Sequence, residues 1–220
     1  MSEIKYVRFD FSEVTNHQKY QLIECYREIF SVGVKKEWLK CRVCGQHWGL
    51  EDHELLLENR YYHCGEPLTD FWSRHELLDY LENNLTSPGT SCCLVFDGSK
   101  MVALGWGYPA TIMELEEKLE IEIDLGFPPS YIVAYQEKSG VLPEYRDSKI
   151  GKVSFTKRVD DYLAAGLEYG IVRTIRDPQP NLIYLWLTKK LGYKVIATYP
   201  GNDGRVVIGG SLKKLRNLLG

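Results

Sequence analysis

The pattern of apolar and polar residues at the start of the chain predicts a strand followed by a helix. Residues 4–11 are rich in β-branched and aromatic side chains, which favour a strand. Thr15 or Asn16 then caps a helix whose apolar positions recur at helical spacing as far as Phe30.

Residues 33–70 interrupt this regular pattern. Aromatic residues, glycine, histidine and three cysteines crowd a stretch with little periodicity, which is typical of a small loop-rich or metal-binding insert. A second helix follows, because Ser73 and Glu76 have the spacing of a capping box and precede an apolar stripe that reaches Leu85.

The rest of the chain alternates between the two kinds of element. Residues 91–98 and 100–110 predict a β-hairpin, and residues 112–124 predict a short acidic helix. The remaining predicted elements are strands at 130–136, 170–175, 193–200 and 205–212, and helices at about 149–167 and 180–191. This order predicts an α/β or α+β fold with a central mixed sheet.

Composition is that of a globular protein with one domain, residues 1–220, that carries the insert. The chain has 220 residues, of which 44% are hydrophobic and 26% charged. No apolar run approaches the ~20 residues of a membrane span, and the first thirty residues lack the pattern of a secretory signal. We therefore expect a cytoplasmic protein, without a membrane partner, whose cysteines are reduced.

The charge balance argues against nucleic acid as a partner. Lysine and arginine total 27 against 30 acidic residues, a formal net charge of −3, so the overall field does not attract polyanions. The sequence leaves a monomer and a homodimer open.

Residues 140–152 carry the clearest chemical signal. They join a predicted strand to a predicted helix, so backbone N–H groups and the positive end of the helix dipole would face a bound anion. Arg146, Lys149 and Lys152 add positive charge, which suits a pyrophosphate. Basic residues at such a turn can also serve solubility alone.

The same segment resembles the acetyl-CoA pyrophosphate loop of the GNAT acetyltransferase superfamily, V-x-P-x-[YW]-[RQ]-x-x-G-x-[GA]. The matching residues are Val141, Pro143, Tyr145, Arg146 and Gly151. Lys149 departs from the pattern, because it stands where the family usually has its first loop glycine.

A second segment, NLIYLWLTKKLGYKV, resembles the superfamily's N-x-x-A-x-x-L-Y-x-K-x-G-F motif. The matching residues are Asn181, Leu187, Lys190, Gly192 and Tyr193. Tyr184 replaces the small residue, and Thr188 replaces the tyrosine that protonates the CoA thiolate in many members.

The resemblance implies a GNAT-like, mostly antiparallel sheet flanked by helices, with acetyl-CoA as cosubstrate. It also implies that the strand before the loop splays from its neighbour and pairs with the pantetheine arm. The implied cofactor contacts are Ser139, Gly140, Val141, Arg146, Asp147, Ser148, Lys149, Ile150, Gly151, Lys152 and Asn181.

Acetyl transfer needs a base for the amine and an acid for the leaving thiolate. Glu137, on the strand entering the loop, is the candidate base, although a solvated strand-end carboxylate would have the same sequence. Tyr184 is the candidate acid, because it lies one helical turn before Thr188. Packing of Tyr184 against the sheet is the alternative.

The insert contains candidate metal ligands. Cys41 and Cys44 form a C-x-x-C pair, and Cys64 stands in a second, incomplete zinc knuckle. The fourth ligand must come from His47, His53 or His63. We expect His53, because His63 is adjacent to Cys64. These ligands predict a structural zinc ion, and a degenerate ribbon without metal is the alternative.

These signals together predict an acetyl-CoA-dependent N-acyltransferase. The acidic stretch from Glu114 to Asp124 favours a cationic amine acceptor, either a small molecule or a protein, unless it is only a solvated helix face. The alternative function is a catalytically inactive GNAT-like module that binds CoA or another protein. A zinc-ribbon nucleic-acid protein is disfavoured by the net charge.

Overall fold

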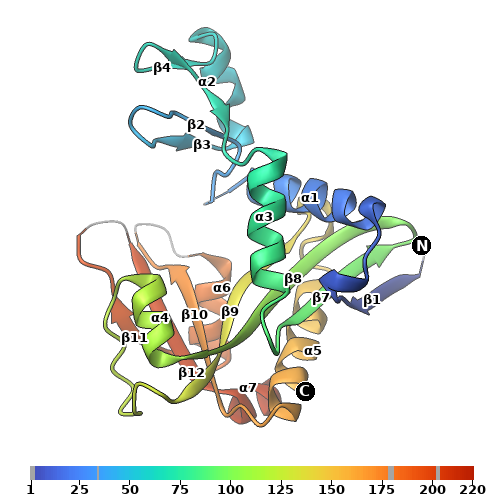
Figure 1. Ribbon diagram of the computed structural model, residues 1–220, viewed down its shortest axis with the longest axis vertical. Helices are drawn as coiled ribbons and strands as arrows, with labels where there is room; N and C mark the ends of the chain where they lie inside the picture. Colours follow the sequence, from blue (N-terminus) through green and yellow to red (C-terminus); the bar gives the residue numbers. More distant parts are fainter. Residues whose placement is uncertain (1–2, 34, 178–180, 202–203) are drawn as a thin grey trace. The chain divides into compact units, whose positions relative to one another are not determined.

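A mixed sheet of seven strands is the central element of the fold (Figure 1). The computed structural model describes residues 3–33, 35–177, 181–201 and 204–220. The strands lie in the order β1, β7, β8, β9, β10, β12, β11. Their bounds are Ile4–Arg8 for β1, Ser91–Asp97 for β7, Lys100–Thr111 for β8, Ile132–Val141 for β9, Tyr169–Ile175 for β10, Lys194–Thr198 for β11 and Arg205–Ser211 for β12. The predicted mixed α/β fold is confirmed.

Helices connect most of these strands. Their bounds are Asn16–Phe30 for α1, Arg74–Leu85 for α3, Ile112–Leu119 for α4, Ile150–Ala164 for α5, Leu182–Leu185 for α6 and Leu212–Leu219 for α7. Within the described parts of the chain, none of the helices has both the length and the apolar character needed to cross a bilayer.

The helix starts follow from capping chemistry. Ser73 and Glu76 form the predicted capping box of α3, and Thr15 caps α1 with Gln18 as its partner. The acidic helix is shorter than the predicted 112–124, because the chain turns into the left-handed conformation at Glu120.

The C-terminal part differs more from the prediction. Instead of one regular helix over 180–191, whose first residue lies outside the described residues, α6 is short and continues as the π-helical segment η4 (Trp186–Lys190). Helix α7 was not predicted, although the cap Ser211 and the apolar spacing of Leu212, Leu215 and Leu219 are present in the sequence.

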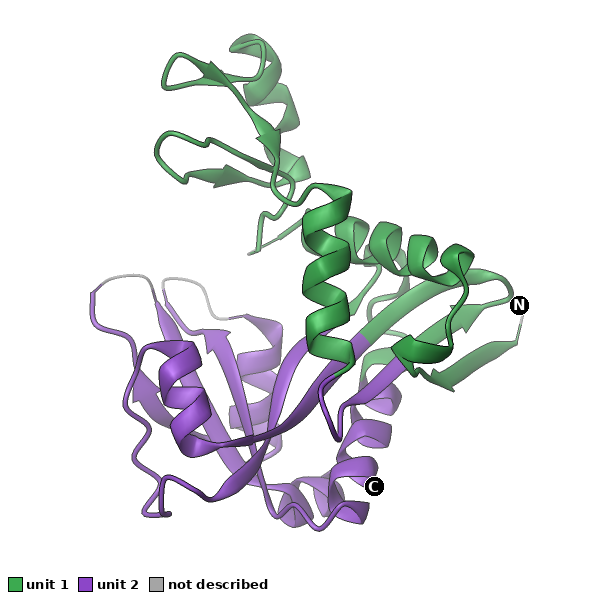
Figure 2. Ribbon diagram, in the orientation of Figure 1, with its two compact units in different colours: residues 1–86, 94–104, 140–151 green, residues 87–93, 105–139, 152–220 purple. Residues whose placement is uncertain are grey.

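The chain divides into two compact units, which are coloured separately in Figure 2. The first unit comprises residues 1–86, 94–104 and 140–151. The second comprises residues 87–93, 105–139 and 152–220.

The core of the second unit lies on both faces of its strands. Val172 and Ile208 face one side with α5 and α7, whereas Ile171 and Val207 face the other side with α4. This alternation follows from the two-residue period of a strand, and it places successive residues of β9 on opposite faces.

Residues 33–70 lie in the first unit and form two small sheets. Strands β2 (Leu39–Lys40), β3 (His47–Trp48) and β6 (Thr69–Asp70) make one, and β4 (Tyr62–His63) and β5 (Glu66–Pro67) make the other. The short helices η1 (Phe11–Glu13), η2 (Leu50–Asp52) and α2 (His53–Glu58) complete this unit's elements before α3.

The insert has a very small apolar core. Its buried residues are Cys41, Trp48 and Leu56, and partly buried aromatic and leucine side chains pack around them. Glu37 connects the insert to α1, because its carboxylate accepts a hydrogen bond of 2.8 Å from the Tyr26 hydroxyl. So small a core needs additional stabilisation to hold a unique fold.

Candidate functional site

Strands β9 and β10 are parallel, but they pair over only two residues. Ala134 is opposite Gly170, and Tyr135 is opposite Ile171. Beyond Tyr135 the two strands no longer pair with each other, and Figure 1 shows them diverging. In the described part of the chain, β9 therefore has no partner on β10 past Tyr135, and an extended ligand lying along this edge could bond to backbone groups.

Gln136 is a second unusual feature of β9. Its side chain is 4% exposed, and within the described residues neither its amide nitrogen nor its amide oxygen has a hydrogen-bond partner. Buried amides are nearly always satisfied in native proteins. The amide lies near the buried Tyr193 hydroxyl, so it is a polar group of the core of the second unit.

Side-chain contacts stabilise the turn between β9 and α5. The 3-10 helix η3 (Pro143–Tyr145) follows β9, and the Tyr145 hydroxyl donates to a carboxylate oxygen of Asp97 at 2.9 Å. Lys100 and Glu144 form an ion pair of 2.8 Å beside it. These contacts fix the turn without using the backbone N–H groups at the start of α5.

The backbone N–H groups of Asp147, Ser148 and Lys149 make no hydrogen bond to another backbone group in the described turns and loops. Those of Ile150 to Lys152 belong to the first turn of α5, where a helix has no internal partner for them. The Arg146 N–H is different, because it donates to the Pro143 carbonyl at 3.2 Å. The amide of Arg146 is thus already used, whereas the amides that follow it are available to an anion.

The conformation of Lys149 explains why the GNAT pattern has glycine there. Lys149 has φ of 64° and Asp147 has φ of 69°, both in the left-handed region. Glycine adopts this conformation without strain, and a lysine does not.

Two glycines allow close approach of the chain near the turn. A Cβ atom at Gly140 would lie 2.3 Å from Ile29 Cγ2, and one at Gly151 would lie 3.3 Å from Val141 Cγ2. Gly140 is therefore required by packing.

Asn181 and Tyr184 lie in the second unit. The Asn181 side chain caps α6, because its carbonyl oxygen accepts from the Ile183 N–H at 3.0 Å. Tyr184 is half-buried and packs against the apolar core on the α5 side. The Thr188 hydroxyl donates to the Tyr184 carbonyl at 2.7 Å, so it is engaged within its own helix.

Glu137 is engaged in an ion pair. Its carboxylate lies 2.7 Å from the Lys118 ammonium and accepts a hydrogen bond of 3.3 Å from the Tyr108 hydroxyl. The Glu137 side chain is only 3% exposed, so it is not the solvated strand-end carboxylate of the alternative interpretation. Burial, and then the charge of Glu137, raises the pKa of Tyr108.

Two residues of the acidic stretch stabilise local structure. Glu114 completes the capping box of α4, and the backbone N–H of Thr111 together with its hydroxyl lowers the Glu114 pKa. Glu116 accepts a hydrogen bond of 2.8 Å from the Ile123 N–H.

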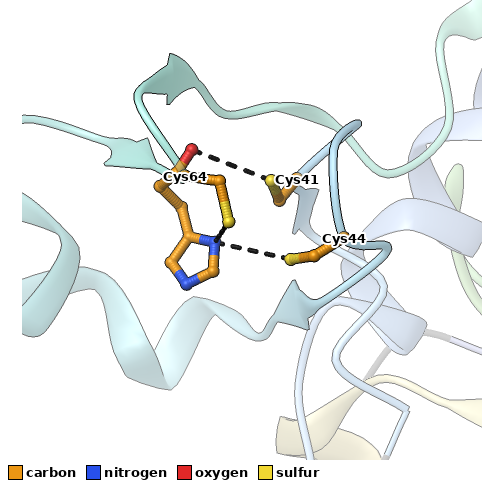
Figure 3. A group of neighbouring side chains, drawn as sticks. Cys41, Cys44 and Cys64 are labelled. Carbon is orange, nitrogen blue, oxygen red and sulfur yellow. Dashed lines mark hydrogen bonds between the residues drawn. The ribbon is translucent and has the colours of Figure 1, made fainter.

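The insert brings four candidate metal ligands together. The ligand atoms of Cys41, Cys44, His63 and Cys64 all lie within 4.8 Å of one another. His63 Nδ1 is 3.5 Å from the sulfur of Cys44 and 3.2 Å from that of Cys64 (Figure 3). A tetrahedral site with Zn–S bonds of about 2.3 Å would place its sulfurs roughly 3.8 Å apart, so the group needs only a small contraction.

The expectation that His53 is the fourth ligand is corrected, because His63 takes that place in the cluster. His53 Nδ1 instead lies 2.7 Å from the Tyr61 hydroxyl. His63 and Cys64 can converge although they are adjacent, since Cys64 has φ of 52° and Gly65 has φ of 80°. Positive φ at both loop residues makes a tight hairpin turn between β4 and β5.

The crowded thiols influence one another. A hydrogen bond from the Cys44 backbone N–H lowers the pKa of Cys41 to about 6. The neighbouring Cys44 thiol raises the pKa of Cys64 to about 11. A cation placed among these sulfurs would favour their ionised forms.

Sequence reasoning missed three of these features. Lys118 and Tyr108 are far from Glu137 along the chain, and no spacing signal connects them. His63 was weighed and set aside because the left-handed turn at Cys64 was not anticipated. Gln136 is an ordinary polar residue of a strand until its burial is known.

Comparison with known proteins identifies the fold. No protein-family model matches the chain, and no curated protein matches it. Among solved structures, the chain is similar to the PaiA N-acetyltransferase of Thermoplasma acidophilum in complex with coenzyme A, with 14% identity and a TM-score of 0.54. That alignment covers 95% of this chain and 99% of the other.

Two further solved structures agree. One is an acetyltransferase of the GNAT family from Streptococcus pneumoniae, with 11% identity, a TM-score of 0.52 and coverage of 95% and 99%. The other is Arabidopsis thaliana NAA60 in complex with a bisubstrate analogue, with 12% identity, a TM-score of 0.52 and coverage of 95% and 98%. At these identities the similarity shows the fold alone, and the predicted GNAT-like fold is confirmed.

Proposed function

We propose that the protein is an N-acyltransferase that moves an acetyl group from acetyl-CoA to a primary amine of a small molecule or protein. The observation that carries the proposal is the opening between β9 and β10, followed by a turn whose N–H groups from Asp147 to Lys152 are available to an anion. Solved structures of the same fold include one in complex with coenzyme A, which supports the proposal.

The residues around the opening fit the cofactor. Ser139, Gly140 and Val141 would pair through their backbone with the extended pantetheine arm. Asn181, in the second motif segment, would contact the pantetheine or the pyrophosphate.

The turn fits a pyrophosphate. The N–H groups of Asp147, Ser148, Lys149, Ile150, Gly151 and Lys152 would bind it. Lys149 and Lys152 would add cationic side chains. At position 149 the positive charge of lysine would offset the loss of the conformational freedom that a glycine has there. The amide of Arg146 is left out of this set, because it is bonded to Pro143.

The chemistry requires one bond to form and one to break. The amine nitrogen attacks the thioester carbonyl carbon, the new C–N bond forms, and the C–S bond breaks as the CoA thiolate leaves. Glu137 would take a proton from the ammonium of the acceptor. Tyr184 is the proposed donor of a proton to the thiolate.

The engagement of Thr188 favours a second candidate function. Its hydroxyl bonds to the Tyr184 carbonyl, and no tyrosine stands at its position. The chain would then be a GNAT-like module that binds CoA without catalysing transfer.

Titration calorimetry with acetyl-CoA, CoA and ADP tests the cofactor site. We expect Lys152→Ala to weaken CoA binding by roughly tenfold, about 1.4 kcal/mol, by removing a cation from the first turn of α5. Lys213→Ala is the matched control, because Lys213 is also exposed in the first turn of a helix, α7. Equal binding of ADP and CoA, or equal effects of the two variants, would refute the cofactor site.

Release of CoA from acetyl-CoA separates the two functions. A panel of primary amines and lysine peptides is incubated with the protein and acetyl-CoA, and free thiol is measured. Steady release that depends on one class of amine supports catalysis. Tight CoA binding without release for any acceptor supports the binding module.

For the insert we propose a structural zinc ion held by Cys41, Cys44, His63 and Cys64. Three thiolates and one imidazole are a common donor set for structural zinc, and a closed site of this kind contributes folding energy. Metal analysis of the purified protein should give one zinc per chain.

A further inference from the structure

The ion pair of Glu137 lies among tyrosine side chains on the α4 face of the second unit. The Lys118 ammonium is 2.7 Å from the Glu137 carboxylate and donates to the Tyr108 hydroxyl. The same nitrogen lies 5.0 Å from the centre of the Tyr108 ring and 5.4 Å from that of Tyr135. We call Glu137, Tyr108 and Tyr135 the ammonium cage.

The cage has the chemistry of a cation-binding site. A carboxylate, a hydroxyl oxygen and two aromatic faces converge on one nitrogen, and each of them attracts a positive charge. The two rings are 5.8 Å apart in an edge-to-face arrangement, which holds both in place. Burial raises the pKa values of Tyr108 and Tyr135, so both hydroxyls remain neutral hydrogen-bonding groups.

Lys118 reaches the cage from α4, and the packing of α4 does not use the Lys118 side chain. Helix α4 is anchored by its buried residues Ile112, Leu115 and Leu119. The Lys118 side chain is 37% exposed, whereas Glu137 beneath it is 3% exposed. Lys118 can therefore rotate into solvent while the apolar face of α4 stays packed.

An additional cation cannot simply join Lys118 in the cage. The guanidinium of Arg173, on β10, already lies within the field of Glu137. A third positive charge beside one carboxylate would be repelled by both. An incoming cation must therefore replace Lys118.

We propose that the ammonium cage binds the protonated primary amine of the acceptor, and that Lys118 is an internal occupant which the acceptor displaces. A primary ammonium can donate to the carboxylate of Glu137 and the hydroxyl of Tyr108 together, whereas a quaternary ammonium can donate to neither. The inference rests on the proposed function and names the acceptor's recognition site. Lys118 would then compete with the acceptor, so only amines with enough affinity for the cage would displace it.

Chemical rescue tests the cage without acetyl-CoA. Lys118→Ala removes the occupant and should lower the melting temperature, because Glu137 loses its ammonium partner. Ethylammonium chloride should then raise the melting temperature of this variant saturably, by roughly 2–4 °C. Tetramethylammonium chloride at the same ionic strength should raise it less, because that cation interacts with the rings and the carboxylate but cannot donate a hydrogen bond.

Two variants make the result specific. The double variant Lys118→Ala, Glu137→Gln lacks the carboxylate, so it should show no selective response to ethylammonium. If Lys118→Ala does not fold, Lys118→Met keeps the apolar stem, and calorimetric titration with ethylammonium replaces the melting curve. Equal responses to the two cations, or equal responses with and without Glu137, would overturn the proposal.

A kinetic experiment connects the cage to the acceptor. If the protein acetylates a small primary amine, Lys118→Ala should lower the KM for that amine by roughly tenfold, since displacement no longer opposes binding. An unchanged or raised KM would contradict this role. Absence of any acetyl transfer would refute the proposed function, while the rescue experiment would still report on the cage.

Discussion

Replacement of His63 is the sharpest test of the metal site, because the insert also offers a matched histidine. Each ring packs near a tryptophan: His63 is 4.9 Å from Trp48 and His53 is 5.7 Å from Trp38, measured between ring centres. Only His63 places a nitrogen among the three cysteine sulfurs. His63→Ala and His53→Ala therefore remove similar aromatic contacts and differ in the metal ligand.

The expected effects differ in size. Loss of a residue that merely supports a metal ligand typically lowers metal affinity 10- to 100-fold. Loss of a ligand should exceed the upper end of that range, so His63→Ala should lower zinc affinity by more than about 100-fold, or about 2.8 kcal/mol. His53→Ala should stay within about tenfold.

Loss of metal should also loosen the insert, because its buried core is limited to Cys41, Trp48 and Leu56. Limited proteolysis should cut residues 33–70 in His63→Ala under conditions that leave wild type and His53→Ala intact. The far-UV circular dichroism of the protein should change little, because α3 and the seven-stranded sheet stay folded.

Competition against a chelating dye gives the affinities, and cobalt substitution reports the geometry. A tetrahedral cobalt site with three thiolates absorbs strongly in the visible range, and His63→Ala should lose much of that intensity. The reasoning is refuted if His53→Ala releases the metal and His63→Ala retains it, or if wild type binds no zinc.

Three further predictions concern the proposed cofactor site and α4. Gly140→Ala should destabilise the fold by about 1–3 kcal/mol, since the new Cβ would meet Ile29 at 2.3 Å; an unchanged melting temperature contradicts the close packing. Asn181→Asp keeps the helix cap and removes the amide donor, so it should weaken CoA binding through a lost contact; an affinity equal to that of wild type by calorimetry would exclude a direct contact. Hydrogen bonds from Thr111 lower the Glu114 pKa in the folded state, so the ionised carboxylate stabilises the fold near neutral pH and the contribution is lost as pH falls through the folded pKa. Glu114→Gln should therefore reduce the drop in melting temperature on acidification, and a pH profile identical to that of wild type contradicts the cap at Thr111.

The sequence was most informative where local chemistry determines structure. The capping box at Ser73, the hairpin of β7 and β8, and the turn before α5 depend on neighbouring residues, and all appear as predicted. The Cys41 and Cys44 pair was found from its spacing for the same reason. The functional roles assigned to these residues remain predictions.

The sequence was least informative where distant residues meet. The contact of Lys118 with Glu137 depends on α4 packing against β9, and no local pattern encodes it. His63 was misjudged because adjacent residues normally point to opposite sides of a strand. A left-handed residue at Cys64 removes that alternation, and the sequence offered only Gly65 as a hint.

The departures from the GNAT motifs acquire a physical meaning when they are placed in the structure. Lys149 keeps the left-handed turn that glycine normally supplies, so the shape of the loop is retained at a cost in strain while a cation is added beside the free N–H groups. The Thr188 hydroxyl donates to the Tyr184 carbonyl within its own helix, and Tyr184 is the proposed proton donor in place of the missing tyrosine. Cofactor binding and proton donation therefore depend on different residues of this chain. A protein that binds CoA tightly but frees no CoA from acetyl-CoA would have kept the binding residues and lost the proton donor.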